Sequence, residues 1–578
     1  MNRLLTWLSV FVLATTWACS NTEKGATDPG AATQTEQAKP DDLARLLGQI
    51  PAETPYVFVS TEPMPEKIVN KIFKLIEPLR AEMEKELAEE LKSMAASDAL
   101  EDRAGRAILE EFAGKLSRKG LASLGIDTSP QWAIYGVGLM PVFRISLADA
   151  AKLRAAIERV EKKAGAKAPT KKIGAQDYWF FSEDGVTVAM AIVGEEFVVA
   201  VSPDSLVAKS LPIAFGQTAP AKSLASAGTI DALRKAHGYK AVGVGLISLT
   251  GITDVVLGKT GGLSAETITA MGGSLPPMTP VCKTEIGAMV AKAPQLSFGY
   301  TEISDTKWVS KANLALDPAL SKELMGIVGS VAGLGDPTPA FLKVGVGLDL
   351  KKTVAFVRAR LAAMAASPFK CAMLNDLNQA VTEGNANIGS VAAQLPPFLM
   401  GVKGANLVIK EADIASQDMS KVKAHVVLTA DQPVQLVTML KATVPPFANL
   451  DITPNGKPVK LPLPPGQLPP GVDPYIAMGK TGLGVSVGAG EEHKLVKLID
   501  AKASSTTFLA VGYDIGRFMT AANQQMAAMR AMMPPEAQAA NQASEAFTKA
   551  ISEVFGFTYS RVDFTDHGIE FTQSVWLK

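Results

Sequence analysis

The chain has 578 residues, and 47% of them are hydrophobic, which is enough to form a large core over several domains. It carries 57 basic and 57 acidic residues, and this balance argues against nucleic acid as a partner, because nucleic-acid binding requires a basic surface. None of its four histidines and three cysteines has metal-ligand spacing, so we expect no metal and no cofactor.

The N-terminus has the three-part layout of a secretory signal. Arg3 is followed by an uncharged apolar stretch, residues 4–14, and then by small or polar residues up to Cys19. The apolar stretch is shorter than the about 20 residues that a membrane-spanning helix requires. We therefore expect residues 1–18 to be a signal peptide, so that the mature chain begins at Cys19.

The segment around Cys19 resembles a bacterial lipoprotein signal, in which a lipobox of the Leu-Ala-Gly-Cys kind is lipidated on the cysteine sulfur. Ala18 and Cys19 conform to that motif, whereas Thr16 and Trp17 depart from it. The resemblance implies a lipid anchor on Cys19 and a place in the cell envelope, and the outer membrane is favoured because Asp does not follow the cysteine. The alternative is ordinary signal-peptidase cleavage.

Residues 19–44 lack aromatic residues, and we expect them to form a disordered tether.

The rest of the chain contains five pairs of similar segments in the same order. For example, FRISLADAAKLR at residues 143–154 is echoed by HVVLTADQPVQL at residues 425–436. In both segments a strand pattern ends in Ala-Asp and a helix pattern begins. The sequence therefore predicts an α+β fold of two repeated halves, each an antiparallel or mixed sheet with packed helices. The halves span residues 45–332 and 338–578.

Two segments depart from this repeat. Residues 80–120 are highly charged with apolar positions at helical spacing, which predicts a helical insertion in the first half. Residues 461–474 are rich in proline, which predicts an exposed loop in the second half.

The motifs PAETPYVFVSTEPMPE and IYGVGLMPVFRISLADAAKLR resemble a group of uncharacterised proteobacterial envelope lipoproteins. That resemblance implies no activity and no functional residues.

Cys282 and Cys371 are the two cysteines that remain after Cys19. In an oxidising envelope they are expected to form one disulfide, which would close a loop of about 90 residues and join the two halves. Such a loop constrains the unfolded chain by roughly 4 to 5 kcal/mol in the entropy model. Free buried thiols are the alternative.

A possible nucleophile is Ser486, in the Gly-x-Ser-x-Gly motif of residues 484–488. His493 and His567 follow it and are candidate bases, although nothing in the sequence places either one near the serine. The repeat instead aligns Ser486 with Ala200, inside a strand rather than at the sharp turn that such a nucleophile requires.

The sequence thus supports three functional hypotheses. The first is a membrane-tethered, non-enzymatic binding or interaction scaffold, because an anchor and a duplication are visible and no catalytic constellation is. The second is a carrier of lipid or another hydrophobic ligand between the two halves, and the third is a serine hydrolase using Ser486. The carrier would use a methionine-rich segment as a flexible apolar lining. These methionines are Met519, Met526, Met529, Met532 and Met533.

Overall fold

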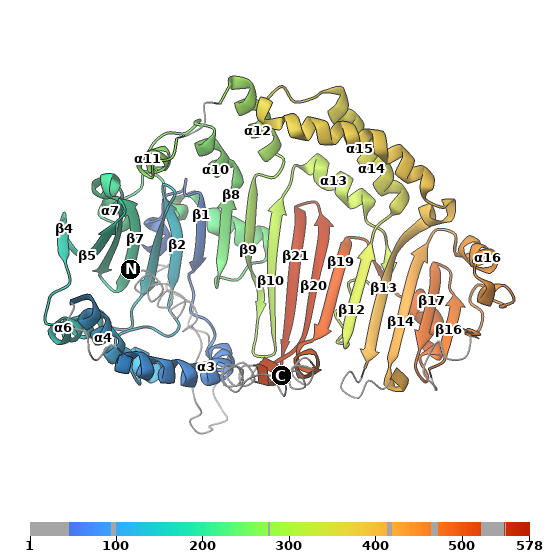
Figure 1. Cartoon of the computed structure of the whole chain (residues 1–578), viewed down its shortest axis with the longest axis horizontal. Coiled ribbons are helices and arrows are strands. Elements are labelled where there is room, and N and C mark those ends of the chain that lie inside the picture. The colour runs from blue at the N-terminus through green and yellow to red at the C-terminus, as the bar shows by residue number, and fades with distance from the viewer. Residues whose placement is uncertain are drawn as a thin grey trace. The chain divides into compact units, whose positions relative to one another are not determined.

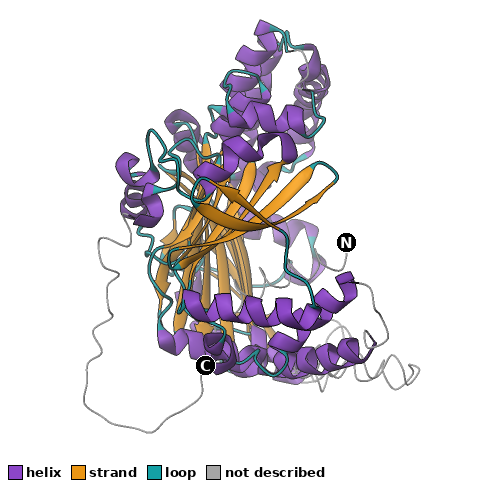
Figure 2. Ribbon diagram, turned by 90° about the vertical axis from the view of Figure 1, so that its left-hand side faces the viewer, coloured by secondary structure: helices purple, strands orange, loops and turns teal. Residues whose placement is uncertain are grey.

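The fold is α+β, with helices packed on antiparallel sheets (Figure 2). It is seen in a computed structural model that describes residues 45–93, 100–274, 278–412, 419–463, 472–521, 548–549 and 551–578. Among these residues, no helix is both long and apolar enough to cross a membrane. The signal peptide and tether expected at residues 1–44 lie outside the described residues, as does most of the proline-rich loop.

The chain divides into two compact units. Of the described residues, unit 1 contains those up to 274, 295–308 and 548–554, and unit 2 contains 278–294, 309–521 and 555–578. This division differs from the expected halves at residues 45–332 and 338–578. Residues 309–332 belong to unit 2 because they supply a strand beside its last strand and a helix whose end packs on Phe564.

Unit 1 is built on an antiparallel sheet with the strand order β9-β8-β1-β2-β3-β7-β6-β5-β4. Its strands are β1 (Tyr56–Ser60), β2 (Trp132–Val137), β3 (Met140–Ser146), β4 (Thr170–Ile173), β5 (Gln176–Glu183), β6 (Val186–Val193), β7 (Glu196–Pro203), β8 (Val244–Ser248) and β9 (Gln295–Ile303). One face of this sheet carries the core of the unit, in which Val57, Val59 and Tyr135 are fully buried.

The helices of unit 1 begin and end at recognisable sequence signals. Asp149 caps α6, where its side chain accepts the backbone N–H of Lys152 at 3.0 Å, and Gly165 ends the helix in a left-handed conformation. The helical region expected at residues 80–120 begins earlier, at Glu66. The helices are α3 (Glu66–Ser93), α4 (Leu100–Phe112), α5 (Arg118–Ser123), α6 (Ala150–Ala164), α7 (Val207–Ala214), α8 (Leu224–Ala227), α9 (Thr229–His237), α10 (Leu249–Val256) and α11 (Leu263–Ala270).

Unit 2 has an antiparallel sheet with the strand order β21-β20-β19-β12-β13-β14-β17-β16-β15, and β10 pairs with β21. A short ribbon of β11 (Val331–Ala332) and β18 (Ala503–Ser504) lies outside this sheet. The sheet strands are β10 (Lys307–Ala315), β12 (Leu342–Gly347), β13 (Val402–Glu411), β14 (Lys423–Ala430), β15 (Val459–Lys460), β16 (Pro474–Met478), β17 (Gly482–Val487), β19 (Thr507–Asp514), β20 (Phe555–Thr565) and β21 (Gly568–Leu577).

The helices of unit 2 cover parts of its sheet. Helix α17 packs on β14, β16 and β17 through Leu495 and Ile499, which are fully buried. Figure 1 shows α13, α14 and α15 at one end of β12 and β13, and α16 beside β14, β16 and β17. The helices are α12 (Pro280–Val290), α13 (Pro318–Ile327), α14 (Leu350–Ala366), α15 (Asn375–Gln394), α16 (Pro433–Thr443) and α17 (Leu495–Ile499).

Candidate functional site

The residues predicted from the sequence do not form one site. Cys19, Met526, Met529, Met532 and Met533 lie outside the described residues. Met519 is half-buried in a helix at residues 515–521 that follows β19. The remaining predicted residues, which are Cys282, Cys371 and Ser486, all belong to unit 2.

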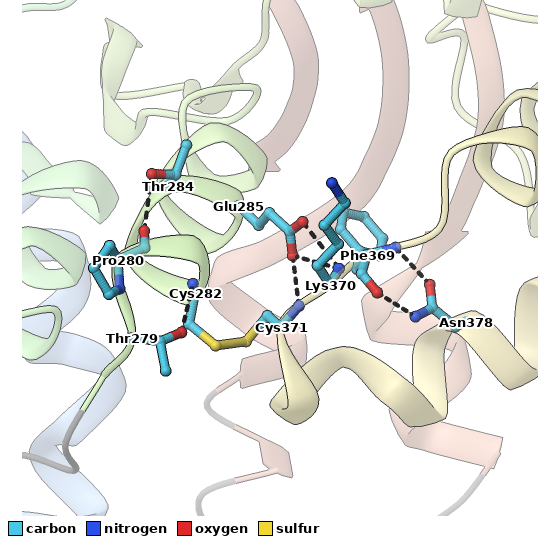
Figure 3. Close-up of a disulfide and its surroundings, with 9 residues drawn as sticks. All are labelled: Thr279, Pro280, Cys282, Thr284, Glu285, Phe369, Lys370, Cys371 and Asn378. Atoms are coloured by element: carbon cyan, nitrogen blue, oxygen red, sulfur yellow. Dashed lines mark hydrogen bonds between the residues drawn. A yellow bond between two sulfur atoms is a disulfide. The ribbon is translucent and has the colours of Figure 1, made fainter.

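Cys282 and Cys371 form a disulfide within unit 2, with sulfur atoms 2.11 Å apart and Cα atoms 4.7 Å apart (Figure 3). We expected this bond to join two halves of the molecule, but both cysteines pack in the same unit. Cys282 lies in the first turn of α12, where Thr279 caps the helix by accepting the Cys282 N–H at 3.2 Å. Both residues are buried, so the bond ties α12 to the segment between α14 and α15.

A carboxylate reinforces the same attachment. Glu285, one turn after Cys282 on α12, accepts the backbone N–H of Lys370 at 3.0 and 3.1 Å and that of Cys371 at 2.9 Å (Figure 3). On the other side of this segment, Asn378 accepts the N–H of Phe369 at 2.9 Å and donates to its carbonyl oxygen at 2.7 Å. The sequence did not reveal these contacts, because Glu285 lies 85 residues from Lys370. Together they indicate a structural role for the cysteines.

Ser486 lies inside β17, and its side chain is on the buried face of the unit 2 sheet, with only 1% of the residue exposed. It is therefore not at a sharp turn between a strand and a helix. Its neighbour on β14 is His425, a residue that the sequence did not suggest as a partner. Neither Ser486 Oγ nor His425 Nδ1 has a hydrogen-bond partner in the described part of the chain. A serine nucleophile requires a base within hydrogen-bond distance, and Ser486 has none there.

The two histidines that we considered as bases lie elsewhere in unit 2. The side chain of His493 is 82% exposed and contacts Glu492 at 3.1 Å. His567 is in the turn between β20 and β21, where its side chain is 53% exposed and contacts Asp566 at 3.7 Å. Both side chains are exposed, whereas Ser486 is buried.

His425 is held neutral by its surroundings. Burial and the positive charge of nearby Lys410 lower the pKa of His425 to about 4. Lys410 pairs with the carboxylate of Glu491, which is buried and also accepts from Lys494 at 3.0 Å. Burial opposes ionisation of Glu491, but the hydrogen bonds from Lys410 and Lys494 hold its pKa below the usual value. The charges around His425 are therefore paired with one another.

Lys343 and Tyr559 lie on the same buried face, on β12 and β20. Burial lowers the pKa of Lys343, although its ammonium group donates to the carbonyl oxygen of Asp336 at 2.8 Å. Burial raises the pKa of Tyr559 to about 12, and its hydroxyl accepts the backbone N–H of Gly335 at 3.0 Å. The segment at residues 335–336 therefore supplies partners for polar groups that the sheet directs inward.

The opposite face of this sheet is apolar over four neighbouring strands, β19, β12, β13 and β14, and has exposed side chains on three of them. Val344 and Val346 on β12 are 39% and 37% exposed, and Val426 on β14 is 40% exposed. Cross-strand partners lie on the same face of a sheet, so the pairing registers identify the other side chains between and beside them. We call this surface the apolar face. It consists of Leu342, Val344, Val346, Ala405, Leu407, Ile409, Val426, Leu428, Leu509, Val511 and Tyr513.

One end of the apolar face has a polar edge. Tyr513, which is 38% exposed, contacts the ring of Phe518 with centroids 5.8 Å apart, and Phe518 is 52% exposed. Arg517 lies in the same helical turn as Phe518. Its side chain is 59% exposed and contacts Asp514 at 3.5 Å. The edge therefore has aromatic rings and one exposed cation next to a surface of aliphatic side chains.

Comparison with known proteins gives no further assignment. No family model matches the chain, and neither the curated proteins nor the solved structures provide a significant match. The described residues contain no group of three or more metal-ligating side chains that could hold an ion. Of the described residues on β12, β14 and β19, the exposed large apolar side chains all lie on the apolar face.

Proposed function

We propose that this protein is a membrane-tethered, non-enzymatic protein of the cell envelope that binds an apolar partner on the apolar face. The observation that carries the proposal is the exposure of five of its side chains by 37 to 40% in the middle of an antiparallel sheet. Antiparallel sheets commonly direct apolar side chains toward the core and polar ones toward water. An apolar patch that remains exposed marks an interaction site.

A hydrophobic fluorescent probe tests this proposal. The mature protein is expected to bind anilinonaphthalene sulfonate with saturation, and the double variant Val344→Lys, Val426→Lys is expected to lose most of that signal. The control is Val256→Lys on α10 of unit 1, because Val256 has the same 40% exposure as Val426 but lies outside the face. Equal probe binding by all three proteins would contradict the proposal.

The membrane tether is the second part of the proposal, and it rests on the sequence around Cys19. Metabolic labelling with a palmitate analogue is expected to mark the protein, and the label is expected to disappear in Cys19→Ala. Fractionation of the labelled cells then tests the outer membrane as its location. Retention of the label by Cys19→Ala would count against the anchor.

We also propose that the two units are copies of one ancestral unit. Their strand orders support this, because β8-β1-β2-β3-β7-β6 in unit 1 corresponds to β19-β12-β13-β14-β17-β16 in unit 2. In both units helices follow the central strand: α3 and α4 follow β1, and α14 and α15 follow β12. The helical insertion expected at residues 80–120 thus has a counterpart in unit 2. A solved structure in which the cores of the units do not superpose would oppose this origin.

A serine hydrolase is the second candidate function, and one observation favours it. Ser486 and His425 are direct neighbours on adjacent strands, and each has a buried polar atom without a partner among the described residues. A substrate that exposed the buried face of the unit 2 sheet would meet the imidazole of His425 as a base beside the hydroxyl group of Ser486. Labelling by a fluorophosphonate, lost in both Ser486→Ala and His425→Gln, is the expected result for this function. Absence of labelling in the native protein would remove it.

A further inference from the structure

We infer that the ligand of the apolar face is a free long-chain fatty acid, with its hydrocarbon chain across β12, β13, β14 and β19 and its carboxylate at Arg517. This inference rests on the proposed binding function and names the ligand class for the same face. Three properties of the face carry it: its chemistry, its size and the charge at its edge.

The chemistry of the face favours hydrocarbon. Its side chains are aliphatic apart from Tyr513 at the edge, so its centre has no polar side chain. The backbone groups of β12, β13 and β19 are engaged in strand pairing on both sides. A ligand over Val344 therefore gains hydrophobic and dispersion contacts and finds no hydrogen-bond partner there. A protein partner typically contributes about one hydrogen bond per 100–200 Å² of interface, and the centre of this face has nothing to receive them.

The size of the face favours a small ligand over a second copy of the chain. Four strands about 4.8 Å apart, each with five residues that rise about 3.4 Å, give an area of about 300 Å². A stable protein–protein interface buries about 800 Å² on each partner. The face alone is thus too small to hold a dimer together, but it accommodates one extended hydrocarbon chain.

The edge of the face favours an acid as the polar group of the ligand. Arg517 is 59% exposed, and its 3.5 Å contact with Asp514 leaves the guanidinium accessible. A guanidinium binds carboxylates through paired N–H donors, which suits a fatty acid. Tyr513 belongs to the apolar face and contacts the ring of Phe518, the residue that follows Arg517. Aromatic rings suit the place where an amphiphile changes from its polar end to its apolar chain.

The test uses the full mature protein and a fluorescent fatty acid that is displaced by oleic acid. We expect saturable binding that the double variant Val344→Lys, Val426→Lys weakens by about tenfold or more, which corresponds to about 1.4 kcal/mol per factor of ten. Val256→Lys is expected to bind like the native protein. Arg517→Gln is expected to weaken oleic acid but not its methyl ester. Circular dichroism establishes that each variant is folded.

The possible failures are distinguishable. If anilinonaphthalene sulfonate binds the apolar face but oleic acid does not displace it, the fatty-acid inference is overturned and the binding function stands. If neither molecule responds to the lysine substitutions, both are overturned. If light scattering detects a dimer that the same substitutions dissociate, the occupant is a second copy of the chain and the inference is wrong. Equal loss of oleic acid and its methyl ester in Arg517→Gln overturns the carboxylate contact.

Discussion

The central strands of the two units carry different side chains on the face of the sheet that is covered. In unit 1, β1 directs Val57 and Val59 into the core, where both are fully buried. In unit 2, β12 directs Val344 and Val346 toward solvent and buries Lys343, which is only 6% exposed. A similar strand order therefore does not determine which side chains a strand buries. What packs on the covered face determines it.

The segment that covers β12 explains why its covered face has Lys343 and glycines instead of valines. Residues 328–336 pack on the face of β12 that has Lys343, Gly345 and Gly347. A Cβ atom on Gly347 would lie 2.5 Å from the carbonyl oxygen of Gly329, so only glycine permits this approach. In unit 1 the corresponding face is covered by a large apolar cluster that includes Leu46 and Ile50. The larger side chains of β12 consequently remain on the apolar face.

The two units also differ in how many strand side chains they expose. In the described part of unit 1, Phe181 is the large apolar side chain on a strand that exceeds about a third exposed. The described part of unit 2 has six such residues, four of them on β12 and β19. They are Val344, Val346, Val426, Leu509, Tyr513 and Phe571. Exposure of this kind is thus concentrated in unit 2, which is why we propose binding there.

The largest expected effect comes from removal of the disulfide, which is expected to weaken unit 2 and to leave unit 1 unchanged. Replacement of both Cys282 and Cys371 by serine removes a bond that closes a loop with a sequence separation of 89 residues. The entropy model gives a loss of about 4 to 5 kcal/mol. Hydrogen exchange read by mass spectrometry is expected to report faster exchange in unit 2 and unchanged exchange in unit 1. Equal acceleration in both units would show that their stabilities are coupled.

A buried ion pair gives a similar effect in unit 1. Arg144 is fully buried and donates to Glu196 and, at 2.7 Å, to the carbonyl oxygen of Ala214. Glu196→Gln leaves that charge without its partner, and we expect a loss of about 3 to 5 kcal/mol in the free energy of unfolding. Glu491→Gln in unit 2 is the matched control. It is expected to cost less, about 1 to 2 kcal/mol, because its partner Lys410 is 31% exposed and can reach water.

Acidification is expected to destabilise unit 2 through His425. Its pKa is about 4 in the folded state and about 6.5 when unfolded, so the unfolded chain binds the proton first as the pH falls. Stability is therefore lost between about pH 6.5 and pH 4, by about 2 kcal/mol from pH 7 to pH 5. Urea unfolding at those two pH values measures the loss. His425→Gln is expected to reduce it, and an unchanged pH dependence in that variant would count against a buried neutral histidine.

The smallest expected effect tests directly whether the valines of the two central strands differ in burial. Val344→Ala on β12 is expected to change the free energy of unfolding by less than about 0.5 kcal/mol, because the side chain is already 39% exposed. Val57→Ala, at the equivalent strand of unit 1, is expected to cost about 2 kcal/mol or more, because it empties space in a fully buried core. Equal losses from thermal unfolding would indicate that the apolar face is covered.

The sequence predicted local structure better than it predicted surfaces. A strand that ends in Ala-Asp before a helix is what the structure has at α6, which begins at Ala150, and at α16, which begins at Pro433. At α6 the signal is local, since the Asp149 side chain caps the first turn of the helix. At α16 the N-cap residue is Gln432, which makes no side-chain cap hydrogen bond. The sequence did not identify the apolar face, because the alternation of β12 would place its valines in the core. The sequence identified Ser486 but not its neighbour His425, because their strands are far apart along the chain.

The glycines of β12 reverse the usual expectation about which substitutions a strand tolerates. Gly347 is on the covered face, and a methyl group there would meet two backbone carbonyl oxygens, that of Gly329 at 2.5 Å and that of Thr507 at 2.6 Å. The mild change Gly347→Ala is therefore expected to impair folding, whereas the drastic change Val344→Lys, at an exposed position, is expected to leave the fold intact and to alter only ligand binding. In a random library of β12 variants, substitutions on the covered face are expected to lower the amount of folded protein. Substitutions on the apolar face are expected to leave that amount normal and to reduce ligand binding.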